Sequence, residues 1–307
     1  MGNEVTPPAV PEMRLRRQAV YYYLILMLWP LYLLILPPVF EYGGWFLFPF
    51  LVFPGMYIFT WLGYLMHESW HKYVPGVNHR FFYNAFALMI LSDPQIYRMT
   101  HGWHHSKVHT YEDAEFHPAG EIKPRGLRIV YNGMEIVLGI AFLVAVAGWA
   151  IPRDSRFKDK YKAWKLLLSF SAWALFFGGI GVLSHFLFGV RAFHVVLSYL
   201  LIFWAGSFIL HQSQLVEHGN LIVEGTFQQR NGRTRNLPPG GIFEKIFLFL
   251  THDDSREHVL HHTATTVHSR PFPGVVPLPE NAVRINLTGH CRNLWRMLAG
   301  KIDRAGA

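Results

Sequence analysis

Long apolar stretches constrain this chain more than any other feature of its sequence. Apolar runs close to 20 residues recur along it, and that is the length an α-helix needs to cross the hydrocarbon core of a bilayer. Of the 307 residues, 51% are hydrophobic and only 16% are charged, whereas soluble domains carry roughly 25% charged residues. We therefore predict an all-α integral membrane protein with about four transmembrane helices and a cytoplasmic helical cap.

Basic residues beside the first apolar stretches predict their orientation. Three arginines within residues 14–17 precede the first stretch, Ala19–Phe40, and Lys and Arg mark the cytoplasmic ends of membrane helices. The connection at residues 41–44 contains no basic residue and suits the opposite side. A second stretch, Trp45–Met66, should then return the chain to the cytoplasmic side.

Three further apolar stretches, Ile136–Ile151, Lys165–Phe188 and Val190–Leu210, raise a question of topology. The basic cluster at residues 153–165 lies between the first two and belongs in the cytoplasm. Ile136–Ile151 has only 16 residues, about 24 Å at 1.5 Å per residue, so we predict an interfacial or re-entrant segment there. The other two stretches then form a hairpin with Gly189 at its outer turn.

This topology has four spans, and six remain open if Phe81–Leu91 and Ile136–Ile151 enter the bilayer. Towards the C-terminus, the sequence predicts a polar loop over 228–241, a short amphipathic helix over 242–250 and a membrane-surface helix over 293–304. The predicted organisation is a cytoplasmic tail at residues 1–18, one membrane domain at 19–290 and a surface tail at 291–307.

Histidine clusters are the second distinctive feature. The chain has 18 histidines, and half of them fall in the runs His67-Glu-Ser-Trp-His71, His101-Gly-Trp-His104-His105 and His258-Val-Leu-His261-His262 or at His218. Residues three or four apart share one face of a helix, so each HxxHH run can offer three imidazoles to a shared centre. The predicted metal ligands are His67, His71, His101, His104, His105, His218, His258, His261 and His262.

Nine nitrogen ligands fit a pair of metal ions better than one, because a single zinc takes about four ligands in all. Imidazole suits iron, copper or zinc, and redox chemistry in a lipid setting favours iron. The single cysteine, Cys291, excludes an iron–sulfur cluster and a thiolate zinc site. The carboxylates predicted to lie behind the ligands and hold their free ring N–H groups are Glu68, Asp113, Glu217, Asp254 and Glu257. His211 is also expected behind the ligands, with a tenth ligand as the alternative, and Gln214 could hold a metal-bound water.

The three histidine runs resemble those of the integral-membrane di-iron superfamily, which includes fatty acid desaturases, fatty acyl hydroxylases and membrane alkane monooxygenases. The run from His67 to Lys72 resembles the HExxHK box of the alkane monooxygenases. The run from Gln214 to Gly219 resembles their NYxEHYG box, with Gln in place of Asn. By contrast, the run at His101–His105 keeps the desaturase spacing. The resemblance covers roughly Leu65–Asp113 and His211–Phe272.

This resemblance implies two Fe ions and O2 as cosubstrate, acting on an unactivated C–H bond of a fatty acid or fatty acyl chain. Desaturation is the first expectation; hydroxylation of an alkyl chain and oxidative decarboxylation to a terminal alkene are the alternatives. No catalytic residue is expected beyond the metal ligands. The expected partners are a fatty acyl or alkyl lipid, membrane lipids and a separate ferredoxin, rubredoxin or cytochrome. The basic residues 153–165, Arg230, Arg233 and Arg235 could dock such a carrier, although a topology signal with contact to lipid headgroups is the favoured interpretation of residues 153–165. Aromatic residues expected to line the substrate tunnel are Trp61, Tyr64, Trp173, Phe177 and Trp204.

Other classes of function fit the sequence less well. A metal transporter would place histidines along the centres of its spans, whereas these clusters lie at span ends and in predicted cytoplasmic segments. A membrane-bound zinc hydrolase does not need nine histidines. Nucleic-acid binding would require a compact basic face, and the net charge of +8 is not accompanied by one.

Overall fold

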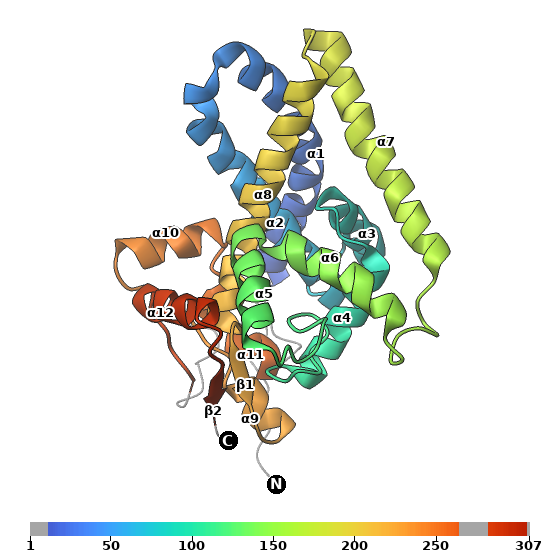
Figure 1. Cartoon of the computed structure of the whole chain (residues 1–307). Helices are drawn as coiled ribbons and strands as arrows, with labels where there is room; N and C mark the ends of the chain where they lie inside the picture. The colour runs from blue at the N-terminus through green and yellow to red at the C-terminus, as the bar shows by residue number, and fades with distance from the viewer. Residues whose placement is uncertain (1–11, 264–281, 306–307) are drawn as a thin grey trace.

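A computed structural model describes residues 12–263 and 282–305, which are mainly helical with only two short strands (Figure 1). In chain order, the helices of the first half are α1 (Glu12–Gly43), η1 (Trp45–Leu47), α2 (Phe48–His71), α3 (His79–Met89), α4 (Pro94–Lys107), α5 (Arg125–Leu138), α6 (Ile140–Ala150) and η2 (Ile151–Arg153). The remaining elements are α7 (Ala163–Phe188), α8 (Ala192–Glu217), β1 (Leu221–Val223), α9 (Phe227–Gly232), α10 (Ile242–Leu250), η3 (Asp254–Arg256), α11 (His258–Thr263), α12 (Leu287–Leu298) and β2 (Asp303–Ala305).

Among the described residues, four helices are long and apolar enough to cross a membrane, which confirms the predicted number of spans. They are Gln18–Gly43 in α1, Pro49–His71 in α2, and the whole of α7 and α8. The four run together in the upper part of Figure 1, with α7 splayed to one side. Their lower ends lead into the remaining helices, so this lower end is called the histidine end and the upper one the far end.

The two connections at the far end are tied to each other. Gly189 ends α7 with a left-handed backbone (φ 69°), a conformation that glycine adopts at little cost, and the predicted hairpin turn is confirmed there. The hydroxyl of Tyr42 donates to the carbonyl of Phe188 over 2.7 Å. Arg191 donates from Nε to Oε1 of Glu41, also over 2.7 Å. These contacts fix the α1–α2 connection against the α7–α8 turn.

Small residues let α2 and α8 approach closely in the centre of the bundle. A Cβ added at Gly206 would lie 2.4 Å from the ring of Phe59, and one at Gly63 would lie 2.7 Å from Leu210. Phe59 in turn packs against Trp29, a fully buried residue of α1. Close backbone approach through glycine is typical of helix packing in membranes, and here it positions the last turns of α2 and α8 side by side.

The predicted interfacial stretch Ile136–Ile151 is divided by a sharp turn at Gly139. Its φ is 64°, and a Cβ there would lie 2.3 Å from the carbonyl oxygen of Ser207. The hydroxyl of Ser207 donates to the carbonyl of Leu138 and accepts from the amide of Ala141, both over 2.7 Å. The turn therefore ends α5 on α8, and α6 leaves crosswise to the bundle (Figure 1). With 11 residues, α6 is too short to span a bilayer.

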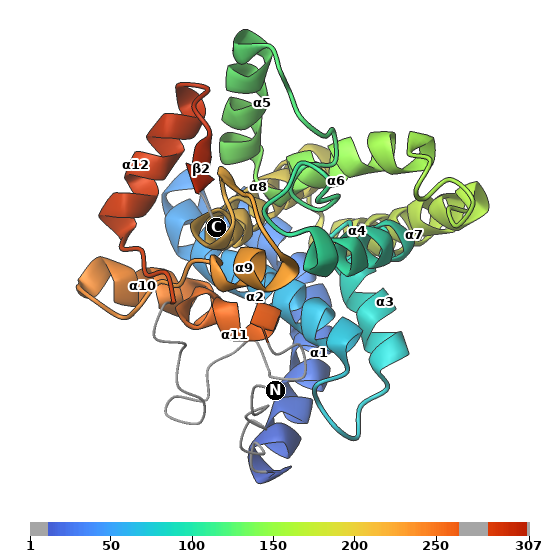
Figure 2. The ribbon, with the colours of Figure 1, turned by 90° about the horizontal axis from the view of Figure 1, so that it is seen from below.

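Short elements cover the histidine end, as the view from below shows (Figure 2). The predicted helix over 242–250 is confirmed as α10. The loop predicted over 228–241 is wrong in its first part, because Thr226 and Gln229 form a capping box that starts α9. The helix expected over 293–304 begins earlier and ends at Leu298. Residues 303–305 instead form β2, which pairs in parallel with β1.

Candidate metal centre

All three histidine runs are carried by helix segments at the histidine end. The last turn of α2 carries His67 and His71, because α2 continues beyond the apolar stretch to its end at His71. Asp93 caps α4 by accepting from the amide of Ile96 over 2.8 Å, and Pro94 follows at the first helical position, which is a favourable helix start. The short helix α11 carries the third run, and His218 caps the C-terminus of α8.

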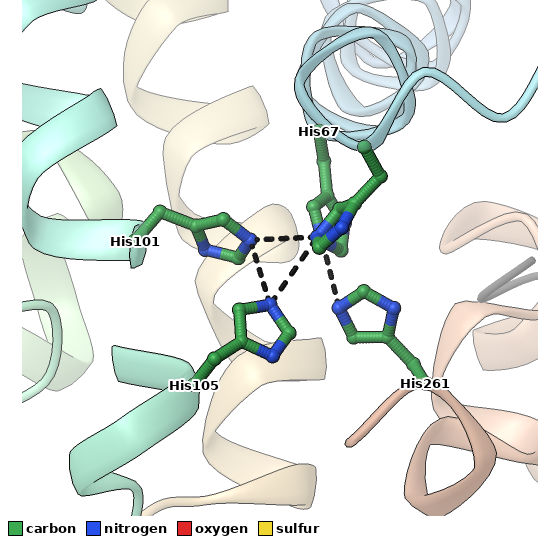
Figure 3. A group of neighbouring side chains, drawn as sticks. His67, His101, His105 and His261 are labelled. Atoms are coloured by element: carbon green, nitrogen blue, oxygen red, sulfur yellow. Dashed lines mark hydrogen bonds between the residues drawn. The ribbon is translucent and has the colours of Figure 1, made fainter. Parts of the chain in front are cut away.

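Five imidazoles converge in what we call the first histidine group: His67, His71, His101, His105 and His261. One ring nitrogen of each lies within 4.8 Å of those of the other four. The Nε2 atoms of His71 and His101 are 3.1 Å apart, and Nε2 of His105 is 3.2 Å from each of them. Figure 3 shows the labelled rings of this group turned toward a common point.

The other four predicted ligands form the second histidine group: His104, His218, His258 and His262. Ring nitrogens of His104, His218 and His262 lie within 4.8 Å of one another, and so do the ligand atoms of Glu217, His218 and His258. The Nε2 atoms of His218 and His262 are 3.3 Å apart. Oε2 of Glu217 is 3.4 Å from Nε2 of His258, so a carboxylate oxygen borders this group.

Each HxxHH run divides its imidazoles between the two groups. His101 and His105 point into the first group, and His104 points into the second. In the last run, His261 points into the first group, whereas His258 and His262 point into the second. The expectation that one run presents three imidazoles to one centre is therefore wrong. The groups adjoin, with the ring centroids of His105 and His262 5.1 Å apart. The chain thus builds two neighbouring centres from the same short helices.

Two acidic residues hold the outward nitrogens of the α4 histidines. Nδ1 of His104 donates to Oδ2 of Asp113, and Nδ1 of His101 donates to Oε2 of Glu115, each over 2.7 Å. Such bonds fix the tautomer and the ring orientation, and they leave Nε2 free to face a metal. Asp113 was among the residues expected behind the ligands. Sequence reasoning missed Glu115, although it lies only two residues further along the same acidic segment.

Three more residues behind the ligands were not expected. The hydroxyl of Tyr73 is 3.0 Å from Nδ1 of His261, and Oδ1 of Asn231 accepts from Nδ1 of His262 over 3.2 Å. Nε2 of His109 is 3.1 Å from Nδ1 of His218. The signal for His109 was its position four residues after His105. Tyr73 and Asn231 carry no sequence signal of this kind.

Burial keeps most of these imidazoles neutral, and neutral imidazole is the form that binds a metal. Burial, reinforced by the neighbouring histidines, holds the pKa values of His101, His261 and His262 well below the ordinary value. The same causes lower the pKa of His105 to about 3. Burial acts most strongly on the pKa of His104 and lowers it, but the charge of Asp113, its hydrogen bond and the charge of Glu115 together outweigh burial and raise the pKa.

The donor set fits a pair of iron ions. Nine imidazoles stand in two groups, seven of them are buried, and the outward nitrogens of several have partners. A family model for fatty acid desaturases matches residues 42–277, more than half of the chain. The chain belongs to the fatty acid desaturase family. Comparison with curated proteins and with solved structures gave no match.

Membership confirms the resemblance that the histidine runs suggested and gives the coarse activity. The family is one of membrane di-iron enzymes, so this desaturase-family protein is a membrane oxidoreductase that modifies fatty acyl lipids. The four long apolar helices agree with a membrane setting.

A cavity that is partly open to solvent runs alongside both histidine groups, with about 1000 Å³ of atom-free space in and around it. Seven of the nine predicted ligands contribute to its wall, together with Tyr64, Gln214 and Glu217. The rest of the lining is mainly apolar and includes Leu143 and Ala147 of α6. Cavities with a mainly apolar lining and a few polar groups are typical binding sites for small organic ligands.

Of the five aromatic residues expected to line a substrate tunnel, Tyr64 is in the wall of this cavity. Trp61 stacks on His252 with ring centroids 4.8 Å apart, and Trp204 donates to the carbonyl of Val137 over 2.9 Å. The remaining two, Trp173 and Phe177, pack against other rings of the bundle. None of these four is in the wall of this cavity.

Of the other residues expected behind the ligands, two lie close to a predicted ligand and four contact other residues. Glu217 and Asp254 approach His258 to 3.4 and 3.7 Å. Glu68 accepts from the hydroxyl of Tyr22 over 3.4 Å, and Glu257 lies 3.9 Å from Arg256. The last two, His211 and Gln214, hydrogen-bond to each other over 2.9 Å.

Proposed function

We propose that this protein introduces a double bond into a fatty acyl chain, using two iron ions and O2. One observation carries the proposal: two adjoining histidine groups stand in the wall of a large apolar cavity. Hydrolysis and metal transport have no need of that combination. An oxidation of an unactivated alkyl chain needs both the redox metal and the apolar space beside it.

In this proposal the first histidine group holds one iron and the second holds the other. When bound, the irons would supply activation of O2 and removal of hydrogen from an unactivated C–H bond. The protein's own residues present neutral imidazoles, and Asp113 and Glu115 fix the rings that they contact. Glu217, at the border of the second group, offers a carboxylate oxygen as a further ligand.

The apolar part of the cavity would hold the acyl chain and keep water from the reacting carbon. Leu143, Val144 and Ala147 present one face of α6 to it, while Ile90 and Ile96 come from the α3–α4 region. Excluding water prevents loss of a reactive intermediate to solvent. Placement of one methylene group beside the histidine groups then decides which carbon is oxidised.

The product class separates desaturation from its two alternatives within the family. Hydroxylation would leave an alcohol, and oxidative decarboxylation would leave a terminal alkene one carbon shorter. The Glu217-His218 segment resembles that of alkane monooxygenases, which favours hydroxylation as the second candidate. Transport is disfavoured because the histidine groups lie at one end of the bundle and not along the span centres.

We further propose that the histidine end faces the cytoplasm. The far-end connections at residues 44–48 and 189–191 carry one basic residue, Arg191, which is paired with Glu41. The basic residues around 14–17 and 153–165 lie at the other end of the spans. Cys291, exposed and the only cysteine of the chain, should react with a membrane-impermeant thiol reagent only when the cytoplasmic face is open.

Electrons would come from a separate ferredoxin, rubredoxin or cytochrome. A short route leads inward from α9, because the carbonyl of Arg230 accepts from Nδ1 of His109, whose Nε2 lies 3.1 Å from His218. Arg230 and Arg233 lie at this surface, and basic side chains there would attract an acidic carrier. Arg235 is buried and lies 3.7 Å from Asp303, so it supports the fold near α9.

The test is turnover by the purified protein in lipid nanodiscs with a reduced carrier, O2 and a mixture of fatty acids and acyl thioesters. Mass spectrometry of the products should show a chain that has lost two hydrogens at an internal position. An alcohol or a terminal alkene as the main product would overturn desaturation in favour of the corresponding alternative. Activity that persists without O2 and reductant would contradict the whole proposal.

A further inference from the structure

A buried hydrogen-bonded line lies between α5 and α8, outside both histidine groups. Oε1 of Glu135 is 3.2 Å from Nε2 of His211, and Nδ1 of His211 donates to Oε1 of Gln214 over 2.9 Å. Glu135 is 5% exposed and His211 is fully buried. A titratable carboxyl and an imidazole are thus held in series in the interior.

The outer end of this line opens on a second cavity of about 600 Å³. Glu135 and His218 are in its wall at the buried end, while Tyr111, His117 and Arg128 line it where the wall becomes partly exposed. Within the described residues, the buried hydroxyl of Tyr131 and Nε of Arg128 have no hydrogen-bond partner. Buried polar atoms of this kind are normally satisfied by water, so the cavity is suited to hold water that connects Glu135 with solvent.

The inner end of the line reaches the apolar cavity beside the histidine groups. Gln214 is in the wall of that cavity together with Glu217 and His218. The three residues therefore connect a polar, solvent-facing cavity with the space in which the substrate would react.

The proposed chemistry requires such a connection. To form one double bond, O2 removes two hydrogens from the chain, takes two electrons from the one-electron carrier and takes two protons from solvent, giving two waters. The electrons can enter along the His109 side, but an apolar cavity that excludes water has no source of protons of its own. The protons must reach it through protein groups or through a path that also admits water.

We propose that Glu135, His211 and Gln214 form the proton-delivery line of this enzyme, an inference that rests on the proposed function. The carboxyl of Glu135 gives its proton to Nε2 of His211 while Nδ1 releases one to water held at the Gln214 amide. The imidazole stays neutral overall, and Glu135 becomes a carboxylate. Water in the outer cavity then protonates Glu135 again, and the imidazole reorients so that its N–H again points toward Gln214 and its unprotonated nitrogen toward Glu135.

A purely structural role explains the line less well. Burying a carboxyl beside an imidazole has a desolvation cost, and apolar side chains of similar volume pack two helices at least as stably. The contact between α5 and α8 already has a polar anchor, because Ser207 bonds to both Leu138 and Ala141 at the Gly139 turn. Glu135 and His211 lie beyond that anchor, between the two cavities.

The experiment compares Glu135→Gln and His211→Asn with the wild-type protein, using His290→Asn as the matched control. His290 is another buried histidine at this end, and it bonds to Gln212 outside the line. Iron content, O2 consumption and product are measured for each, and small diffusible acids such as acetic acid are added to test rescue. Each metal-free protein is also studied by infrared spectroscopy, which reports a protonated buried carboxyl without any turnover.

Glu135→Gln should keep its iron and form product on the order of 10²-fold more slowly than the wild-type protein. Added acid should restore its rate of product formation. One carboxyl band of the wild-type infrared spectrum should be missing from this variant, and His290→Asn should behave as wild type in every assay. If Glu135→Gln does not fold, His211→Asn serves as the second variant because it keeps the carboxyl. It should also form product more slowly than the wild-type protein and recover with added acid. If Glu135→Gln or His211→Asn forms product at the wild-type rate, the proton-delivery role is overturned. If the wild-type protein itself gives no O2-dependent product, the proposed function is overturned instead.

Discussion

The Nε2 atoms of His67 and His261 lie 3.0 Å apart, although the two residues are 194 positions apart in the chain. A hydrogen bond between the two rings would by itself explain the distance within this pair. It would not explain why ring nitrogens of three further histidines lie within 4.8 Å of both. A common cation explains the whole group, because each neutral imidazole can direct one lone pair at it.

Replacing His261 with Ala should remove one ligand from the first histidine group and abolish iron loading at that group, together with turnover. We expect a loss of more than about 100-fold in activity, because even partners behind metal ligands are worth 10–100-fold. Metal analysis and product formation measure the two effects. His290→Ala is the control, since His290 is buried but bonds to Gln212, and a fully active His261→Ala protein would count against the ligand assignment.

Glu115→Ala should weaken iron binding without preventing folding. Glu115 accepts from Nδ1 of His101 over 2.7 Å, so its loss frees the ring to turn and lowers metal affinity by about 10–100-fold. Competition with a chelator measures that affinity. Glu112→Ala, which removes an exposed partner of Lys107, should leave the affinity unchanged; equal effects of the two substitutions would contradict an orienting role for Glu115.

Acidification should destabilise the metal-free protein. Burial, as the largest cause, lowers the pKa of His105 and His109 to about 3 and that of His290 to about 4, whereas an unfolded histidine titrates near 6.5. Below pH ~6.5 the unfolded chain binds protons that the folded chain does not, so stability falls with pH until the folded pKa is reached. Each such histidine removes about 1.4 kcal/mol per pH unit.

Thermal melting in detergent between pH 8 and pH 5 checks this prediction. The melting temperature should be nearly constant above neutral pH and fall continuously below about pH 6.5. A melting temperature that rises on acidification has the wrong sign for histidines buried in the neutral form.

A bulky residue in the cavity wall should shorten the acyl chain that the enzyme accepts. Ala147 of α6 is in the wall and only 7% exposed, so Ala147→Phe should occupy space that the substrate needs. Competition between acyl chains of different length, followed by mass spectrometry, measures the shift. Ala145→Phe places the same ring on an exposed position of α6, and the same shift in both variants would show that the cavity does not hold the chain.

The spans and the composition of the histidine clusters could be predicted from sequence because both have strong local signals. Apolar length alone gave the four spans, and Gly189 marked the hairpin turn. The start of α9 was missed because its capping box depends on one Thr and one Gln in a segment rich in loop-forming residues. The β1–β2 pairing joins short segments far apart in the chain, and no local pattern reports it.

The candidate site was predicted as a set of residues but not as an arrangement. Helical spacing correctly placed His101 and His105 on one face, but it could not show that His104 turns to a second group. Side-chain partners from other segments, such as Asn231 on α9 and Tyr73 after α2, depend on how those segments fold together. Sequence periodicity describes single helices, whereas a metal centre is a property of the contacts among several.

The central claim is that the two histidine groups each hold an iron, and elemental analysis with Mössbauer spectroscopy of the purified, iron-57-loaded protein tests it most directly. We predict about two irons per chain in nitrogen-rich environments, with one of them lost in His261→Ala and the remainder disturbed. A wild-type protein that binds a single ion, or that prefers zinc at one closed site, would contradict the account.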